Sequence, residues 1–234
     1  PLDRWTPAVS FAYTLDGLTF RAWYKKIFRA PTLNDLYYTQ VGNRNLKPEY
    51  TKQLNLGAEY HFDSPRWNVS AQADVYQNKI ENRIVCLPLK GTYTWSMMNY
   101  GYTFCQGLNA TAQGRYQTGS WFFSLLTSLT WQRDLNRTDP DDADTYDKPI
   151  CYSPTLSSGI TSVIGWRNLQ LSTSYLYVGE RMWSYADPDD VLKPYHNIDM
   201  KLTYSRLMNK TNWSVCLEVC DLLDEQYEHI PRYP

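Results

Sequence analysis

Alternation of apolar and polar side chains is the feature that most restricts the fold of this chain. Residues 121–131 carry Trp, Phe, Leu, Thr, Leu and Trp at every second position, and Ser124, Ser128 and Thr130 lie between them. Residues 67–75 alternate in the same way. Successive side chains of a β-strand point to opposite faces, so a period of two predicts strands. The pattern recurs along the whole chain and predicts an all-β fold with one apolar and one polar face.

About ten strands are predicted from the alternation and from turn residues between the runs. They lie near residues 7–14, 17–27, 49–62, 66–79, 99–116, 119–132, 155–165, 168–179, 196–205 and 211–220. Nothing in the sequence is typical of a helix of useful length.

The connections between these strands are of two kinds. Tight turns with Gly, Asp, Asn or Pro are predicted at residues 15–17, 63–65, 118–119, 165–167 and 208–210. Long loops are predicted at residues 28–48, 80–98, 133–154 and 180–195. Tight and long connections alternate, so an antiparallel up-and-down meander would have all tight turns at one end and all long loops at the other. Transmembrane β-barrels show this asymmetry.

Two environments suit the apolar face: membrane lipid, or the core of a soluble β-sandwich. Many predicted strands exceed the ~5–6 residues of typical sheets and reach the ~9–11 residues that cross a membrane. Aromatic residues make up 15% of the chain, and many stand near strand ends, as in the aromatic girdles of membrane barrels. The pattern favours a membrane-spanning sheet and leaves the sandwich as the alternative.

Composition excludes several other classes of protein. The net charge of −1 gives no electrostatic basis for binding nucleic acid. No apolar stretch approaches the ~18–20 residues of a membrane helix. The five Cys are irregularly spaced and do not indicate a disulfide framework, although a Cys86–Cys105 bridge stays open. The three His are scattered, so no metal site is predicted. The chain begins at Pro1, and we expect it to be a piece of a longer protein.

Acidic residues are concentrated in two of the long loops. They are Asp139, Asp141, Asp142, Asp144, Asp147, Asp187, Asp189 and Asp190. Clustered carboxylates could bind calcium or a cationic ligand, but their spacing does not match the D-x-D-x-D-G calcium loop. Solvated loop acids are the alternative interpretation.

Several dispersed motifs resemble those of one family. Residues 28–38 read F-R-A-P-T-L-N-D-L-Y-Y, and residues 43–49 read N-R-N-L-K-P-E. Further matches are Y-Q-N-K-I-E-N at 76–82, M-N-Y-G at 98–101, Y-V-G-E-R at 177–181 and V-C-D-L-L-D-E-Q-Y at 219–227. In this order they resemble the barrels of the outer-membrane TonB-dependent receptors. Asp221 and Leu223 depart from the family, which has Asn and Phe there.

The resemblance implies that residues 1–234 are part of a transmembrane β-barrel that has about 22 strands in the intact family. We expect the plug domain and the final strand to lie outside this chain. An open sheet edge in lipid would leave backbone groups unpaired at several kcal/mol each. The rest of the barrel is therefore expected to come from elsewhere in the parent protein. Charges expected to face the lumen and to pair around the plug are Arg21, Lys25, Glu59, Asp74, Arg115, Lys201 and Glu218.

The resemblance also implies a function in the bacterial cell outer membrane, where lipid surrounds the barrel. The parent would bind a scarce, bulky ligand, such as a siderophore, haem, cobalamin or an oligosaccharide, at its extracellular loops. The TonB complex, engaging the plug domain, would energise its import. No enzymatic activity and no cofactor are expected. A passive porin-like or adhesive barrel, or a soluble β-sandwich binding module, is the alternative.

Two groups of candidate site residues follow. Aromatic residues near the tips of long loops are the candidates for ligand contact, because rings supply large contact area, although loop packing is the alternative for each. They are Tyr37, Tyr38, Tyr93, Trp95, Trp183 and Tyr185. The family-motif residues are expected to be structural. They are Phe28, Arg29, Ala30, Pro31, Asp35, Asn45, Leu46, Lys47, Pro48 and Glu49.

Overall fold

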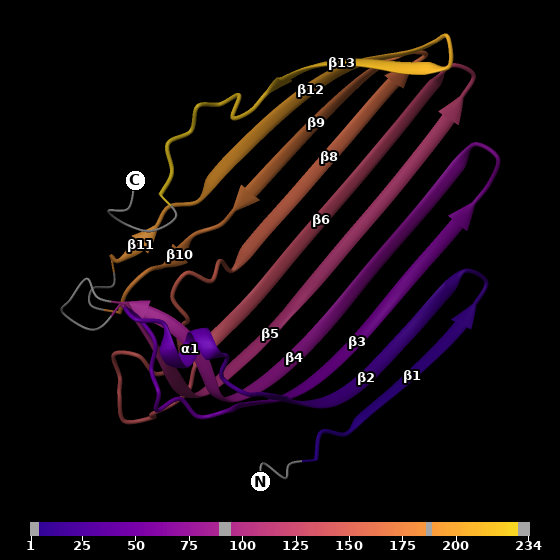
Figure 1. Cartoon of the computed structure of the whole chain (residues 1–234). Helices are drawn as coiled ribbons and strands as arrows, with labels where there is room; N and C mark the ends of the chain where they lie inside the picture. The colour runs from indigo at the N-terminus through magenta and orange to yellow at the C-terminus, as the bar shows by residue number, and fades with distance from the viewer. Residues whose placement is uncertain (1–4, 89–94, 186–188, 229–234) are drawn as a thin grey trace.

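The computed structural model describes residues 5–88, 95–185 and 189–228. Most of them belong to one antiparallel sheet in which each long strand pairs with the next along the chain (Figure 1). The long strands are β1 (Ala8–Leu15), β2 (Leu18–Arg29), β3 (Glu49–Asp63), β4 (Trp67–Pro88), β5 (Trp95–Thr118), β6 (Trp121–Asn136), β8 (Leu156–Trp166), β9 (Leu169–Val178), β12 (Tyr195–Met208) and β13 (Thr211–Val219). The predicted meander of about ten strands is confirmed.

The connections also lie as predicted. The tight turns gather at one end of the sheet, at the upper right of Figure 1, and the long segments gather at the other. Two tight turns have positive φ at both central residues, Asp16 and Gly17 in one and Asn209 and Lys210 in the other. This backbone matches the twist of the flanking strands, which is why short hairpins prefer it. We call the opposite end of the sheet the loop end.

The predicted loop at residues 80–98 was wrong in its extent. β4 continues to Pro88 and β5 begins at Trp95, so both strands project beyond their neighbours. The register is the same before and after Asn82, because Glu81 pairs with Tyr102 and Arg83 pairs with Tyr100. Asn82 itself, with φ 55°, has no pair in this ladder. Residues 84–87 are the consecutive apolar residues Ile, Val, Cys and Leu, so the alternation that signals a strand is absent there.

Short elements at the loop end were not predicted. They are α1 (Leu33–Tyr37), β7 (Lys148–Pro149), which pairs with β6, and the pair β10 (Arg181–Met182) and β11 (Val191–Leu192). No helix in the described part of the chain is long and apolar enough to cross a membrane.

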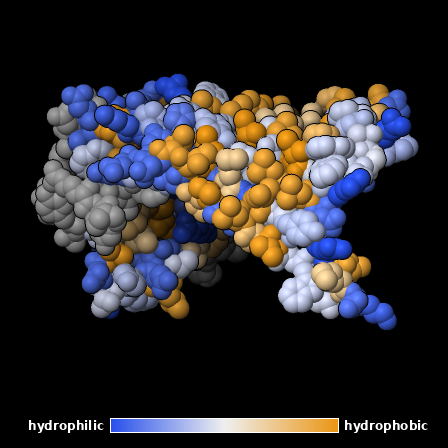
Figure 2. Space-filling view, turned by 90° about the horizontal axis from the view of Figure 1, so that it is seen from above, coloured by the Kyte–Doolittle hydropathy of each residue, from blue (hydrophilic) through white to orange (hydrophobic). Residues whose placement is uncertain are grey.

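One face of the sheet is apolar along its whole width. Side chains that are directly paired across antiparallel strands share a face, and the register places Leu56 opposite Val75 and Phe123 opposite Ile164. Leu56 is 56% exposed and Phe123 is 40% exposed. Figure 2 shows the apolar side chains gathered in a band between polar ends. Aromatic rings border this band near the turns, where Trp67 packs on Tyr116 at 4.4 Å between ring centroids.

The opposite face is polar and carries ion pairs. Arg21 contacts Glu59 at 2.8 Å and Asp74 at 3.6 Å, and Lys201 contacts Glu218 at 3.1 Å. These residues were all predicted to face the lumen of a barrel, and the register places them on the face opposite the apolar band.

The buried apolar side chains lie mainly at the loop end, because a single sheet layer has no second layer to cover either face. They are Leu46, Ile84, Cys105, Leu135, Ile150, Cys151, Leu192 and Tyr195. The segments at the loop end therefore pack together around a small apolar core next to the end of the sheet.

Gly107 in β5 provides a test of the wall's packing. A Cβ atom there would lie 2.5 Å from the Tyr76 hydroxyl and 2.6 Å from the Trp131 carbonyl oxygen, whereas a Cβ at Gly114 in the same strand would meet nothing within 4 Å. We expect Gly107→Ala to destabilise the full-length receptor by about 1–3 kcal/mol, the usual cost of overpacking. Gly114→Ala is the matched control. Urea unfolding of both variants measures the difference, and equal midpoints would contradict this packing.

Candidate functional site

Four segments meet at the loop end and form the candidate site (Figure 1). They are residues 30–48, the projecting ends of β4 and β5 (residues 83–88 and 95–101), residues 137–155, and the described part of residues 179–194, which is 179–185 and 189–194. We call them the mouth segments. Hydrogen bonds between residues far apart in sequence join them, so they form an ordered surface.

The first mouth segment begins with a capped helix. The Thr32 hydroxyl accepts a hydrogen bond from the Asp35 amide, and the Asp35 carboxylate accepts one from the Thr32 amide. This reciprocal capping box satisfies two amides at the start of α1. The Arg29 guanidinium lies 3.5 Å from Asp35 and 3.6 Å from Glu49. One arginine thus connects the end of β2, the helix and the start of β3.

The same segment then packs on the projecting β4–β5 hairpin. Asn43 Nδ2 donates to the Met97 carbonyl at 2.9 Å, and the Met97 amide donates to the Val41 carbonyl at 2.8 Å. Asn99 accepts from the Lys47 amide and donates to the carbonyls of Lys47 and Asn82. These hydrogen bonds therefore hold residues 41–47 against the projecting ends of β4 and β5.

The third mouth segment is attached to the wall through Asp134 at the end of β6. Asp134 lies 3.6 Å from Arg83 and accepts a hydrogen bond from the Ser153 hydroxyl. Gln132 Nε2 donates to the same hydroxyl at 3.0 Å. The Asp134 carbonyl accepts from the Ile150 amide. These contacts fold residues 137–155 back against β6.

Tyr185 joins the third and fourth mouth segments. Its hydroxyl donates to the Pro149 carbonyl at 2.9 Å, and its side chain interacts with Tyr100 and Cys151. Burial raises the pKa of Tyr100 to about 12 and that of Cys151 to about 11. Burial, with the neighbouring Tyr100 and Cys151, also raises the pKa of Tyr185. Buried groups with raised pKa values stay protonated and neutral at ordinary pH, as tight packing of these loops requires.

The predicted ligand-contact residues occupy different environments. Tyr37 and Tyr38 are 58% and 56% exposed, and the Arg44 guanidinium lies over the Tyr37 ring. Trp95 begins β5 with its ring 5.9 Å from that of Tyr152. Trp183 follows β10 and donates its amide hydrogen to the Asp190 carbonyl. Tyr185 packs as described above, and Tyr93 lies outside the described residues.

The family-motif residues are close together. Phe28 packs on Tyr50 with ring centroids 5.3 Å apart, and Leu46 is buried. Ala30 and Pro31 connect β2 to the cap of α1, while Lys47 and Pro48 bond through their backbones to Asn99 and Asn82. The Asn45 amide donates to the Asn43 side chain. Glu49 accepts a hydrogen bond from the Ile84 amide at 3.1 Å.

Several carboxylates of the third mouth segment bind groups of the same segment, and Asp187 lies outside the described residues. Asp139 and Asp142 accept hydrogen bonds from the amides of Asp141 and Asp144, and Asp147 pairs with Arg137 at 2.8 Å. Within the ranges that the structure describes, no group of three or more His, Cys, Asp or Glu could hold a metal ion. The five cysteines are free thiols, so the Cys86–Cys105 bridge is not formed.

Sequence reasoning missed the supporting residues Asn43, Asn99, Arg83 and Asp134. Asn99 lay within a recognised motif, but its role as a bridge depends on the projection of β4 and β5. Arg83 precedes the consecutive apolar residues 84–87, where the alternation is absent. The pattern Thr-x-x-Asp at residues 32–35 is a capping-box signal that could have predicted the start of α1.

A single open wall, apolar on one face, with ordered loops at one end, matches a known family. The family described as TonB dependent receptor-like, beta-barrel, matches residues 2–219. The chain belongs to this family. The vitamin B12 transporter BtuB of Photobacterium profundum is 33% identical over 205 residues, which cover 86% of this chain and 30% of that relative. The chain thus spans about a third of the length of such relatives.

Two solved structures of transport proteins show the same fold. The copper transporter OprC superposes with a TM-score of 0.70 at 17% identity, covering 95% of this chain and 34% of that one. The ferric-catecholate import receptor Fiu from E. coli K12 gives a TM-score of 0.69 at 19% identity, covering 95% and 31%. The meander is therefore part of a barrel wall with one apolar and one polar face.

The raised pKa values at the mouth predict a loss of loop packing in alkali. Cys151 and Tyr100 have pKa values above their ordinary ones when folded, so the packed state holds protons that the opened state releases. The contribution to stability is complete below the ordinary thiol pKa of 9.0 and is lost as pH rises through about 11. In a full-length receptor whose other cysteines are serine, we expect slow alkylation of Cys151 at about pH 8 and a steep rise between about pH 9 and 11.

Two variants test whether packing by Tyr185 is the cause. Tyr185→Ala should accelerate alkylation of Cys151 at about pH 8, because it removes the ring and the hydroxyl that cover the thiol. Tyr38→Ala, which changes an exposed tyrosine of another segment, is the control. If both variants react like the parent, the Tyr185 contact does not protect this thiol.

Proposed function

We propose that this chain is part of the barrel wall and mouth of a bacterial outer-membrane receptor that imports a bulky ligand. One observation carries the proposal: in the described part of the chain, the mouth segments pack together at one end of the wall. One face of that wall is apolar, as a surface in contact with lipid must be. Such an arrangement leaves a structured surface outside the membrane for ligand capture. Family membership supports the same role, and no covalent chemistry is needed for it.

We propose cobalamin or a related corrinoid as the ligand. The relative with 33% identity over most of this chain is named a vitamin B12 transporter. The solved neighbours at 17% and 19% identity, a copper transporter and a ferric-catecholate receptor, support the fold alone. Siderophores, haem and oligosaccharides are therefore competitors in the test. The energy for import is proposed to come from the TonB complex acting on a plug domain of the parent receptor.

The proposed roles of the site residues follow from their surroundings. Tyr37 and Tyr38 present exposed rings beside Arg44 and are the proposed contacts for the ligand. Trp95 and Trp183 are proposed as further contacts on neighbouring segments. Tyr185 is proposed to hold the loops together, because its hydroxyl already bonds to Pro149. The family-motif residues from Phe28 to Glu49 are proposed to be structural, since their contacts join strand ends to the mouth.

Ligand binding by the full-length receptor tests this function. Outer membranes carrying it should bind radiolabelled cyanocobalamin, and energised cells should accumulate the label only when TonB is present. Unlabelled cyanocobalamin should compete, whereas ferric enterobactin and haemin should not. The double variant Tyr37→Ala and Tyr38→Ala should weaken binding by about tenfold, a loss of about 1.4 kcal/mol, because two aromatic contacts are removed.

The control for the double variant is Thr145→Ala in the third mouth segment, where the hydroxyl bonds within its own turn to Asp142. All variants are compared at equal amounts of folded receptor in the membrane. If a siderophore or haemin competes for the site and unlabelled cyanocobalamin does not, cobalamin is not the ligand and the competing molecule takes its place. Accumulation that is independent of TonB would contradict active import and favour a passive barrel.

A further inference from the structure

A row of three lysines lies on the apolar face of the wall, toward its loop end. The register places Lys52 of β3 directly opposite Lys26 of β2 and directly opposite Lys79 of β4. Directly paired residues share a face, and Lys52 shares its face with Leu54 and Leu56, the next residues of the apolar band along β3. All three lysines are exposed. We call Lys26, Lys52 and Lys79 the lysine row.

The lysine row brings like charges together. Neighbouring strands of a sheet are about 4.8 Å apart, so the three side chains leave the backbone within about 10 Å of one another. Like charges directly opposite each other on neighbouring strands destabilise a sheet. Lys52 lies 3.9 Å from Glu81, but no ion pair to Lys26 or Lys79 is found among the described residues. An anion that binds along the row would relieve this repulsion.

Two arginines near the loop end of β6 extend the positive charge. Arg133 is exposed and shares the apolar face with Trp131, two positions away, and the described residues contain no ion pair to it. Arg137 lies over the Phe104 ring at 4.9 Å and pairs with Asp147 at 2.8 Å. The apolar face thus ends, toward the loops, in a group of cations that exceeds its acidic partners.

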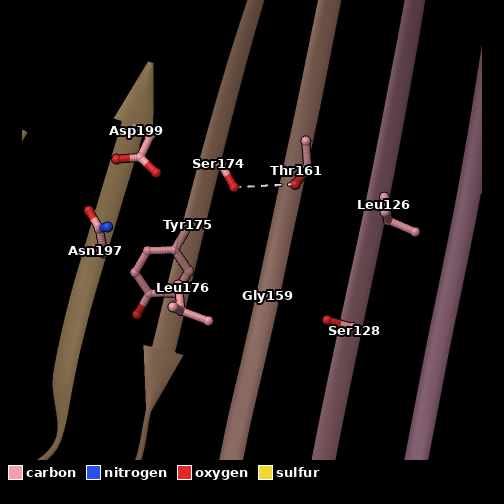
Figure 3. Close-up of a pocket in the computed structure, with 9 residues that line it drawn as sticks. All are labelled: Leu126, Ser128, Gly159, Thr161, Ser174, Tyr175, Leu176, Asn197 and Asp199. Carbon is pink, nitrogen blue, oxygen red and sulfur yellow. Dashed lines mark hydrogen bonds between the residues drawn. The ribbon is translucent and has the colours of Figure 1, made fainter. Parts of the chain in front are cut away.

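The polar face of the wall is arranged differently. Its cations Arg21 and Lys201 both contact carboxylates. A small pocket on this face, of about 250 Å³, offers hydroxyl, amide and carboxylate groups and no cation (Figure 3). The polar side chains that line it are Ser128, Thr161, Ser174, Tyr175, Asn197 and Asp199. Binding of an anion is therefore favoured at the lysine row and not in this pocket.

The lysine row lies where the apolar band ends. Tyr24 precedes Lys26 on the same face, and beyond Lys52 the Tyr50 ring packs on Phe28 at 5.3 Å between centroids. Charged residues on a lipid-facing surface are costly near the middle of a bilayer and cost little at its interface. A lysine can lay its apolar stem along such a surface while its ammonium group reaches the lipid headgroups. The position of the row therefore suits contact with lipid phosphates.

We propose that the lysine row and Arg133 bind a membrane lipid whose headgroup carries at least two phosphates. Several cations side by side match two phosphate groups better than one, because each ammonium or guanidinium group can donate to a different phosphate. The acyl chains of the lipid then lie against the apolar band below the row. This inference rests on the proposed position of the apolar face in the outer membrane, and it is independent of the ligand that the receptor imports.

Lipid binding to the full-length receptor tests the proposal. Native mass spectrometry of the purified receptor in detergent compares diphosphoryl with monophosphoryl lipid A of the same acyl chains, so that only the phosphate number differs. The parent should bind the diphosphoryl form at least fivefold more tightly. The double variant Lys26→Gln and Lys79→Gln should bind that form at least fivefold more weakly than the parent and lose the preference. A parent that does not distinguish the two lipids would overturn the proposal, and this result needs no variant.

The matched control is the double variant Lys25→Gln and Lys201→Gln, which removes the same charge from the polar face. Its affinity for diphosphoryl lipid A should stay within twofold of the parent, and equal weakening in both double variants would contradict a site at the lysine row. Cyanocobalamin binding, measured on the same preparations, should be unchanged by Lys26→Gln and Lys79→Gln. Lipid preference without cyanocobalamin binding would reject the proposed ligand alone, and cyanocobalamin binding without lipid preference would reject the lipid site alone.

Discussion

Backbone pairing in register, repeated from β1 to β13, holds every other feature of this chain in place. Directly paired residues share a face, so a shift of one residue would move a strand's apolar side chains to the lumen. The tight turns set this register at one end. The result is a single layer whose apolar side chains are exposed in the described structure, because no second layer covers them.

The projecting ends of β4 and β5 provide the surface on which the mouth segments pack to form the candidate site. Beyond Asn82 the two strands extend past their neighbours' ends, and Asn43 and Asn99 attach the first mouth segment to them. Arg83, on the same projection, contacts Asp134, which also binds the third mouth segment. The length of these two strands therefore determines where the first and third mouth segments can pack.

The sequence predicted the repetitive part of the structure well. Alternation located the strands, their faces and the tight turns, because each depends on residues close together in the chain. It failed at residues 80–98, because residues 84–87 are apolar at every position and show no alternation. It also could not separate exposed rings from packed ones. Tyr37 and Tyr185 look alike in sequence, but only contacts from distant segments show that the Tyr185 hydroxyl bonds to Pro149.

The central claim is that alternate residues of one strand face lipid and lumen. Nitroxide labels placed singly along residues 121–131 of β6, in the full-length receptor in lipid bilayers, test it most directly. Accessibility to oxygen, which concentrates in lipid, should be high at Phe123, Leu125 and Leu129 and low at Ser124, Ser128 and Thr130. An absent or reversed alternation would contradict a barrel wall with this orientation.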